Sequence, residues 1–453
     1  MDNKMNRREA LKIMAAAGVT FAVFPSVITS CAGSDTKSVQ TNILYEPEPG
    51  AKIASREWAT LGGDKVGLLG LGCMRFPKKA NSQAIDQEQV NEMVKYALDH
   101  GVNYFDTASG YAGSEEATGI GFAESGYPRE SYFIATKLSN HRGSKTLEAG
   151  IETFESSLKK LQTDYFDFYL LHNLPNARAM HERFIDNGLL DWLLEQKKAG
   201  RIRYIGFSFH GNNAAFKEIL ELPYKWDFVQ IQMNYVDWES MQGANDTDAK
   251  TLYTMLEERN IPITVMEPIR GGGLATVNEN LKNMMAQRRP DLSPAGMALT
   301  YVASYPQILC TLSGMSNMAQ LKENIATFSN FKPFDDADKA FMLKVADLYN
   351  SNKHINCTGC EYCMPCPNGV NIPGNFKVYN TTSDELNIPD PDRNDRENGK
   401  KAKIFLNRHK KDLVAGARAD ACTKCNVCLE KCPQHINIPN ELQSIVDLVK
   451  SLG

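Results

Sequence analysis

The plan of the fold is set by residues 102–137, which read VNYFDTASGYAGSEEATGIGFAESGYPRESYFIATK. Runs of aromatic and β-branched residues at 102–108 and 131–137 have the composition of buried strands, and a longer mixed segment separates them. A strand, a helix and a second strand in this order predict one βα unit of a parallel sheet. Two charged side chains, Asp106 and Lys137, stand where the two strands end.

The same alternation continues on both sides of this unit, from Trp58 to the region of residue 330. It yields eight strand candidates, at residues 66–72, 102–108, 131–137, 165–173, 204–210, 228–235, 261–268 and 308–314. Eight parallel strands predict an α/β fold, a closed (β/α)8 TIM barrel, which we place at residues 55–335. The segment REWATLGGDKV, residues 56–66, predicts a short hairpin on the barrel floor.

Local signals agree with this assignment. Apolar residues at helical spacing after Asp86 predict a helix that Asp86 and Gln89 would cap and Gly101 would stop. The glycines of GLLGLG, residues 67–72, lack the spacing of a dinucleotide-binding turn, which argues against a Rossmann domain. A formal net charge of −4 supplies no basic surface for a phosphate backbone, so we expect no nucleic-acid partner.

Four polar side chains follow consecutive strands at the carboxyl-terminal rim, where a barrel places its working groups. Asp106 and Tyr111 follow the second strand, Lys137 the third and His172 the fourth. Carbonyl reduction leaves an oxyanion that must take a proton, and a phenol with a pKa of about 10 donates slowly at neutral pH. We expect Lys137 to lower the pKa of Tyr111 and Asp106 to hold Lys137 in place. His172 would orient the carbonyl by hydrogen bonding.

The words around these residues, NYFDTASGYAGSEEATG, IATK and LLHN, resemble the aldo-keto reductases. The resemblance implies that Asp106, Tyr111, Lys137 and His172 form the catalytic tetrad of that family. It also implies an oxidoreductase that moves a hydride between NAD or NADP and a carbonyl or alcohol. Taken singly, each residue is equally typical of a helix cap, a surface charge or a core group. Their occurrence together, in order and inside matching words, favours the catalytic interpretation.

The resemblance further implies contacts to the nicotinamide. Ser208 and Gln232 match the residues that hydrogen-bond the carboxamide of the ring. Met266 stands where the family usually stacks an aromatic side chain on the nicotinamide, so the stacking surface departs from the pattern.

The rest of the nucleotide is expected along two later segments. The loop PIRGGGL begins at Pro268 and matches the family's loop over the pyrophosphate, with Arg270 and Gly271 at its centre. The segment over the adenosine phosphate supplies Gly314, Gln320, Glu323 and Asn324. Because glycine and glutamine replace the basic residues that often hold the 2′-phosphate, the choice between NAD and NADP stays open.

Eight of the eleven cysteines fall in two runs near the end of the chain. The runs are Cys357, Cys360, Cys363 and Cys366, followed by Pro367, and Cys422, Cys425, Cys428 and Cys432, followed by Pro433. Three-residue spacing before a proline is typical of 4Fe-4S ferredoxins, in which the fourth cysteine often binds the other cluster. The first run is one residue shorter before Cys366, which leaves this exchange open. Two structural zinc sites are the alternative, although zinc sites use isolated cysteine pairs.

The words NGVNIP and QHINIP after the two runs indicate an internal repeat. Residues 336–453 are therefore predicted to form a ferredoxin-like, mostly helical domain with two 4Fe-4S clusters. The polar stretch 380–421 predicts either helices packed on the barrel or a partner site. Packing is the expected role of the isolated Cys73 and Cys310.

Residues 1–31 have the order of an export signal, with a basic start, an apolar run and small residues. Arg7 and Arg8 resemble the pair of a twin-arginine signal, which carries folded proteins across a membrane. The residues before Cys31 resemble a lipobox, in which Cys31 would carry a lipid anchor, and they also suit ordinary signal peptidase. The polar segment 32–54 predicts a tether.

Together these features predict an exported protein, periplasmic or membrane-anchored, whose cofactors are inserted in the cytoplasm. A hydride carries two electrons and a 4Fe-4S cluster usually carries one, so paired clusters or a flavin would mediate between them. The clusters would then connect the barrel to a membrane or periplasmic electron partner. Two alternatives stay open: a carbonyl reductase with structural clusters, and a non-catalytic redox sensor or electron-transfer module. Aldehydes, ketones and sugars all remain candidate substrates.

Overall fold

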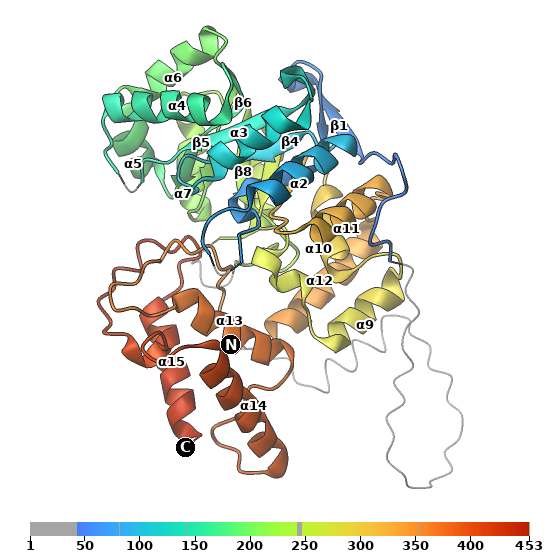
Figure 1. The fold of residues 1–453 in the computed structure, drawn as a ribbon, viewed down its shortest axis with the longest axis vertical. Coiled ribbons are helices and arrows are strands. Elements are labelled where there is room, and N and C mark those ends of the chain that lie inside the picture. Colours follow the sequence, from blue (N-terminus) through green and yellow to red (C-terminus); the bar gives the residue numbers. More distant parts are fainter. Residues whose placement is uncertain (1–42, 81, 142, 242–246, 353, 453) are drawn as a thin grey trace. The chain divides into compact units, whose positions relative to one another are not determined.

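The computed structural model describes residues 43–452, apart from 81, 142, 242–246 and 353. The predicted export signal and Cys31 lie outside the described residues. Eight parallel strands close into a barrel in the order β10-β3-β4-β5-β6-β7-β8-β9. They are β3 (Leu69–Gly72), β4 (Tyr104–Asp106), β5 (Phe133–Leu138), β6 (Phe166–Leu174), β7 (Ile202–Phe209), β8 (Phe228–Gln232), β9 (Ile263–Met266) and β10 (Ile308–Ser313). Figure 1 shows the fold as a ribbon and labels β4, β5, β6 and β8 of this barrel. The predicted (β/α)8 barrel is confirmed.

One predicted strand is divided between two elements. Its first residues belong to β2 (Asp64–Gly67), which pairs antiparallel with β1 (Ser55–Trp58) in a hairpin, and the barrel strand β3 begins only at Leu69. Trp58, Leu61 and Val66 of this hairpin pack in one buried cluster with inward-facing residues of the strands. The hairpin therefore closes the barrel floor, as the sequence predicts.

Helices alternate with the strands around the barrel. They are α2 (Gln87–Asp99), α3 (Ser114–Ser125), α4 (Leu147–Leu161), α5 (Ala177–Met180), α6 (Leu189–Lys198), α7 (Asn213–Glu221), α8 (Ala249–Glu257), α9 (Glu279–Arg288), α10 (Pro294–Ala303), α11 (Met318–Ser329) and α12 (Asp336–Asn350). The predicted cap of α2 is confirmed, because the Gln89 N–H donates to the Asp86 carboxylate. The Gln89 side chain also donates to this carboxylate. It is not the acceptor for the Asp86 N–H, because that group donates to the Pro77 carbonyl.

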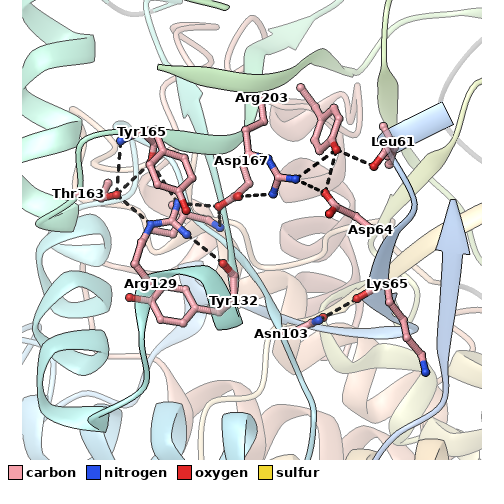
Figure 2. A network of polar contacts seen from close by, with 12 residues as sticks. Leu61, Asp64, Lys65, Asn103, Arg129, Tyr132, Thr163, Tyr165, Asp167 and Arg203 are labelled. Atoms are coloured by element: carbon pink, nitrogen blue, oxygen red, sulfur yellow. Dashed lines mark hydrogen bonds and ion pairs between the residues drawn. The ribbon is translucent and has the colours of Figure 1, made fainter. Parts of the chain in front are cut away.

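A polar network ties the amino-terminal ends of the strands together (Figure 2). The buried carboxylate of Asp167, on β6, accepts hydrogen bonds from Arg129 at 2.6 Å, from Arg203 at 2.9 Å and from the Ile134 N–H at 2.9 Å. Arg203 also donates to Asp64 of the hairpin at 2.6 Å. Charge-assisted bonds of this kind are stronger than neutral ones, so the network fixes the floor on which the opposite rim is built.

The C-terminal region forms a second core from Ile355 onward. Its helices are α13 (Ile372–Asp384), α14 (Arg396–Asp412) and α15 (Ile438–Ser451), and Phe376 and Phe405 bury their rings between them. The polar stretch between the cysteine runs thus forms a helix that packs against α13. In the part of the chain that the structure describes, no helix is both long and apolar enough to cross a membrane.

Candidate active site and cluster sites

The strand ends bring Lys137 and Asp106 into a buried ion pair. Lys137 Nζ lies 2.5 Å from Asp106 Oδ1 and donates to the Thr107 carbonyl at 2.7 Å, and the Lys137 side chain is 1% exposed. Gln230 Nε2, on β8, donates to Asp106 Oδ2 at 3.1 Å. A buried ammonium needs such partners, and the parallel register of β4 and β5 supplies them.

Tyr111 lies in the loop between β4 and α3 and completes the group. Lys137 Nζ is 5.1 Å from the centre of the Tyr111 ring, and the His172 ring meets it edge-on at 5.6 Å. Burial raises the pKa of Tyr111 well above its ordinary value, and Tyr362 and Asp106 raise it further. Our expectation that this pKa lies below its ordinary value is wrong, because burial is the largest effect on it and raises it. Tyr111 is held in its proton-donating form.

His172, on β6, is held in its neutral form. Burial lowers the pKa of His172 well below its ordinary value, and the charge of Lys137 lowers it further. Ser139 Oγ accepts a hydrogen bond from the Gly110 N–H at 3.1 Å and also bonds His172 Nδ1. If Ser139 donates to Nδ1, the ring proton sits on Nε2. This tautomer can donate to a carbonyl oxygen.

Cysteines line two cavities in the C-terminal domain. The first cavity is lined by Cys357, Cys360, Cys363 and Cys432, and the second by Cys366, Cys422, Cys425 and Cys428, with Cys363 touching both. The fourth cysteine of each run therefore lies with the first three of the other run. This is the exchange that the sequence leaves open, and it is the arrangement of two-cluster ferredoxins.

The donor set fits a 4Fe-4S cluster in each cavity. Each cavity pairs its four thiols with apolar walls, which include Ile372 and Phe376 in the first and Ile372 and Leu442 in the second. Burial raises the pKa of Cys363 to about 12, and the neighbouring thiols of Cys357 and Cys360 raise it further. Among the described residues, no three His, Cys, Asp or Glu side chains converge closely enough to hold one metal ion.

Comparison with known proteins assigns both regions. Residues 68–345 match the model of the aldo/keto reductase family, and residues 356–438 match that of a 4Fe-4S dicluster domain. This chain belongs to the aldo/keto reductase family. As an aldo/keto reductase with a 4Fe-4S domain it is an oxidoreductase.

Individual relatives match between 63% and 66% of this chain. The 9,11-endoperoxide prostaglandin H2 reductase of Trypanosoma cruzi is 27% identical over 288 residues, which cover 63% of this chain and 89% of that protein. The holo form of aldo-keto reductase AKR11C1 from Bacillus halodurans superposes with a TM-score of 0.52 at 22% identity, over 65% of this chain and 96% of that one. An aldo-keto reductase of Klebsiella pneumoniae, solved in complex with NADPH, superposes with a TM-score of 0.50 at 19% identity. The superposition covers 66% of this chain and 96% of that one. These two structures are similar in fold.

The residues expected to contact the nicotinamide in an aldo/keto reductase lie at the rim. Two of them already have hydrogen-bond partners within the chain. Ser208, on β7, accepts from the Asn173 N–H at 2.8 Å. Gln434, beside the second cysteine run, donates through Nε2 to Gln232 Oε1 at 2.9 Å, and Gln232 Nε2 lies 3.3 Å from Gln434 Oε1. Met266 ends β9 and is partly exposed.

The expected pyrophosphate loop meets the C-terminal domain directly. Pro268 and Arg270 are buried, and Arg270 Nη2 donates to Asn356 Oδ1 at 3.0 Å. A Cβ added to Gly271 would lie 2.1 Å from the carbonyl oxygen of Thr358, so the two backbones touch here. Thr358 therefore occupies the space beside Gly271, while nothing lies within 4 Å of a Cβ added at Gly272.

The residues expected to contact the adenosine phosphate form hydrogen bonds with neighbouring residues of the barrel. Asn324, on α11, donates to Ser313 at 2.9 Å, and Gln320 accepts from the Ser316 N–H at 2.8 Å. Glu323 lies beside Asn324 and is partly exposed. At Gly314 an added Cβ would come within 3.0 Å of the Arg75 side chain, which itself donates to the Thr358 carbonyl at 2.7 Å. Arg75 thus lies beside Gly314 and bonds to the cluster domain at the same time.

Sequence reasoning missed the residues that join the two domains. Tyr362, between two cysteines of the first run, hydrogen-bonds Tyr111, and its ring lies 6.1 Å from that of His141. Gln434 and Arg75 also form hydrogen bonds between the two domains. No local pattern marks these three positions, since their role depends on where the second domain docks.

Proposed function

We propose that this chain is an exported oxidoreductase that transfers a hydride between NAD or NADP and a carbonyl or alcohol substrate, with two 4Fe-4S clusters exchanging the two electrons of that hydride with the nicotinamide. The contact between Tyr362 and Tyr111 carries the proposal. Tyr362 lies between Cys360 and Cys363, which line the first cluster cavity, so this cavity and the tetrad are joined through one side chain. A purely structural cluster would not need to be at the reacting site.

The tetrad supplies the proton chemistry of the reaction. Tyr111 holds a proton at its hydroxyl, and His172 presents the Nε2 proton to the same substrate oxygen. Lys137, fixed by Asp106, stabilises the phenolate that forms when Tyr111 gives up its proton. These roles require only that a substrate oxygen take the place that the Tyr362 hydroxyl now has beside Tyr111.

The two clusters would supply one-electron transfer at the potential that their surroundings set. Together they match the two electrons of one hydride, and a bound flavin is the alternative mediator. Cys363 touches both cavities, which supports passage from the first cluster to the second. From there electrons would pass to a membrane or periplasmic partner. Aldehydes, ketones and sugars are the candidate substrate classes.

Export is proposed from the leader, with Arg7 and Arg8 as its twin-arginine pair and Cys31 as its lipid site. Cell fractionation tests it directly. The full chain is expected in the membrane fraction, a Cys31→Ser variant in the soluble periplasm, and an Arg7→Lys, Arg8→Lys variant in the cytoplasm. Cytoplasmic retention of the full chain would contradict the proposal.

An anaerobic titration of the cluster-loaded protein with NADH and NADPH tests the coupling. Bleaching of the visible cluster absorption is expected with at least one nucleotide, because electrons must reach the clusters. A carbonyl substrate is then added to reoxidise the reduced protein. A Tyr111→Phe variant is the control for this step, because it shows how much electron transfer bypasses the tetrad. Full nucleotide binding without bleaching would favour a reductase with structural clusters.

A further inference from the structure

The segment Asn356–Tyr362 lies along the rim of the barrel where the nucleotide is expected. It forms hydrogen bonds at three points: Asn356 with Arg270, the Thr358 carbonyl with Arg75, and Tyr362 with Tyr111. Between these points, the Thr358 carbonyl lies against Gly271 with no room for a Cβ.

The side chain of Gln434 has the same functional group as the nicotinamide of the coenzyme. Its side chain is a primary carboxamide, the same group that a nicotinamide ring presents. It forms a reciprocal amide pair with Gln232, with both donor–acceptor distances between 2.9 and 3.3 Å. His435 adds a contact of 3.2 Å to the carbonyl of His210 on the same rim.

We infer that the contacts of Asn356–Thr358 and Gln434 with the rim and the binding of a nicotinamide nucleotide exclude each other, so that these residues form a lid which the nucleotide must displace. This inference rests on the nucleotide site of the proposed function. A phosphate cannot approach Gly271 while Thr358 lies there, and a carboxamide cannot pair with Gln232 while Gln434 does so. The first restriction comes from occupied space. The second arises because Gln232 Nε2 already donates to Asp237 and Gln434, which uses both of its hydrogens.

The lid is polar where it meets the barrel, which suits a reversible contact. Arg270 and Gln232 are both buried, and their hydrogen bonds to the lid are the ones that a nucleotide would replace. Buried polar groups are costly to leave without partners, so each state of the rim must supply them. The lid and the nucleotide thus compete for the same groups.

Nucleotide affinity of the full-length, cluster-loaded protein tests the inference. The variant Asn356→Ala, Gln434→Ala removes two lid contacts and leaves every barrel residue in place. We expect its dissociation constant for NADPH or NADH, followed by nicotinamide fluorescence under anaerobic conditions, to fall about tenfold, which corresponds to about 1.4 kcal/mol. Gln443→Ala is the matched control, because the Gln443 side chain donates to Asp447 within α15.

Hydrogen exchange of the wild-type protein supplies a measurement that needs no variant. Saturating nucleotide is expected to increase amide exchange in residues 355–362 and to leave α15 unchanged. Equal affinities of wild type and variant, or nucleotide binding with no change in exchange of the segment, would overturn the inference. Cluster bleaching is read separately, so tighter binding by the variant without bleaching would retain the lid and reject the electron coupling.

Discussion

The ion pair of Lys137 and Asp106 makes a prediction that separates stability from chemistry. An Asp106→Leu substitution would leave the Lys137 ammonium, whose side chain is 1% exposed, with only the Thr107 carbonyl as a partner. Breaking a buried pair by removing one member costs about 3–5 kcal/mol of unfolding free energy. We therefore expect Asp106→Leu to unfold at a clearly lower urea concentration than the wild type, with a midpoint shift of about 1 M or more.

The double variant Asp106→Leu, Lys137→Met gives the decisive comparison. With both charges replaced by apolar groups of similar size, most of the lost stability should return. A residual loss of about 1 kcal/mol is expected, since Gln230 Nε2 no longer has its acceptor on Asp106. Unfolding is followed by far-UV circular dichroism in urea under anaerobic conditions, and activity should be lost in both variants.

A single variant within about 1 kcal/mol of the wild type would refute this reasoning, because it would show that the Lys137 charge is not buried as described. A double variant as unstable as the single one would refute it too. The expected pattern would mean that the pair is retained for catalysis at a cost in stability.

Three further predictions concern the same two domains. Tyr362→Phe removes a hydrogen bond that raises the pKa of Tyr111, so the alkaline limb of kcat/KM should move to lower pH while the cluster spectrum stays unchanged; an unmoved limb would contradict the contact. Because burial lowers the pKa of His172, the unfolded chain takes up a proton below about pH 6.5 that the folded chain does not, so stability falls toward pH 5, and His172→Gln should reduce this fall in urea midpoints. Cys432→Ser should lose about half of the iron, whereas Cys310→Ser, in the barrel core, should keep all of it in an iron assay.

The barrel and its tetrad could be predicted because their determinants are local. Each tetrad residue follows a strand with a clear apolar pattern, and a parallel barrel brings all such ends to one rim. The start of β3 could not be placed, since Val66 and Leu69 are both apolar and only the pairing of the hairpin divides them.

The state of the site was beyond sequence reasoning for a different reason. Gln232 and Gln434 are 202 positions apart, and nothing near either residue indicates the other. The predicted direction of the Tyr111 pKa shift was wrong for the same reason. Burial raises this pKa and outweighs the charge of Lys137. Contacts between separately folded regions depend on shape, which local patterns do not encode.

The crossing of the two cysteine runs has a consequence for biosynthesis. Each cavity needs the fourth cysteine of the other run, so Cys357, Cys360 and Cys363 remain an incomplete set until Cys432 has left the ribosome. The barrel strands, all of which precede Cys357, are complete well before that moment. During synthesis the barrel strands are therefore available before the complete set of cluster ligands, and the rim can be covered by the cluster domain only after Cys432 has emerged.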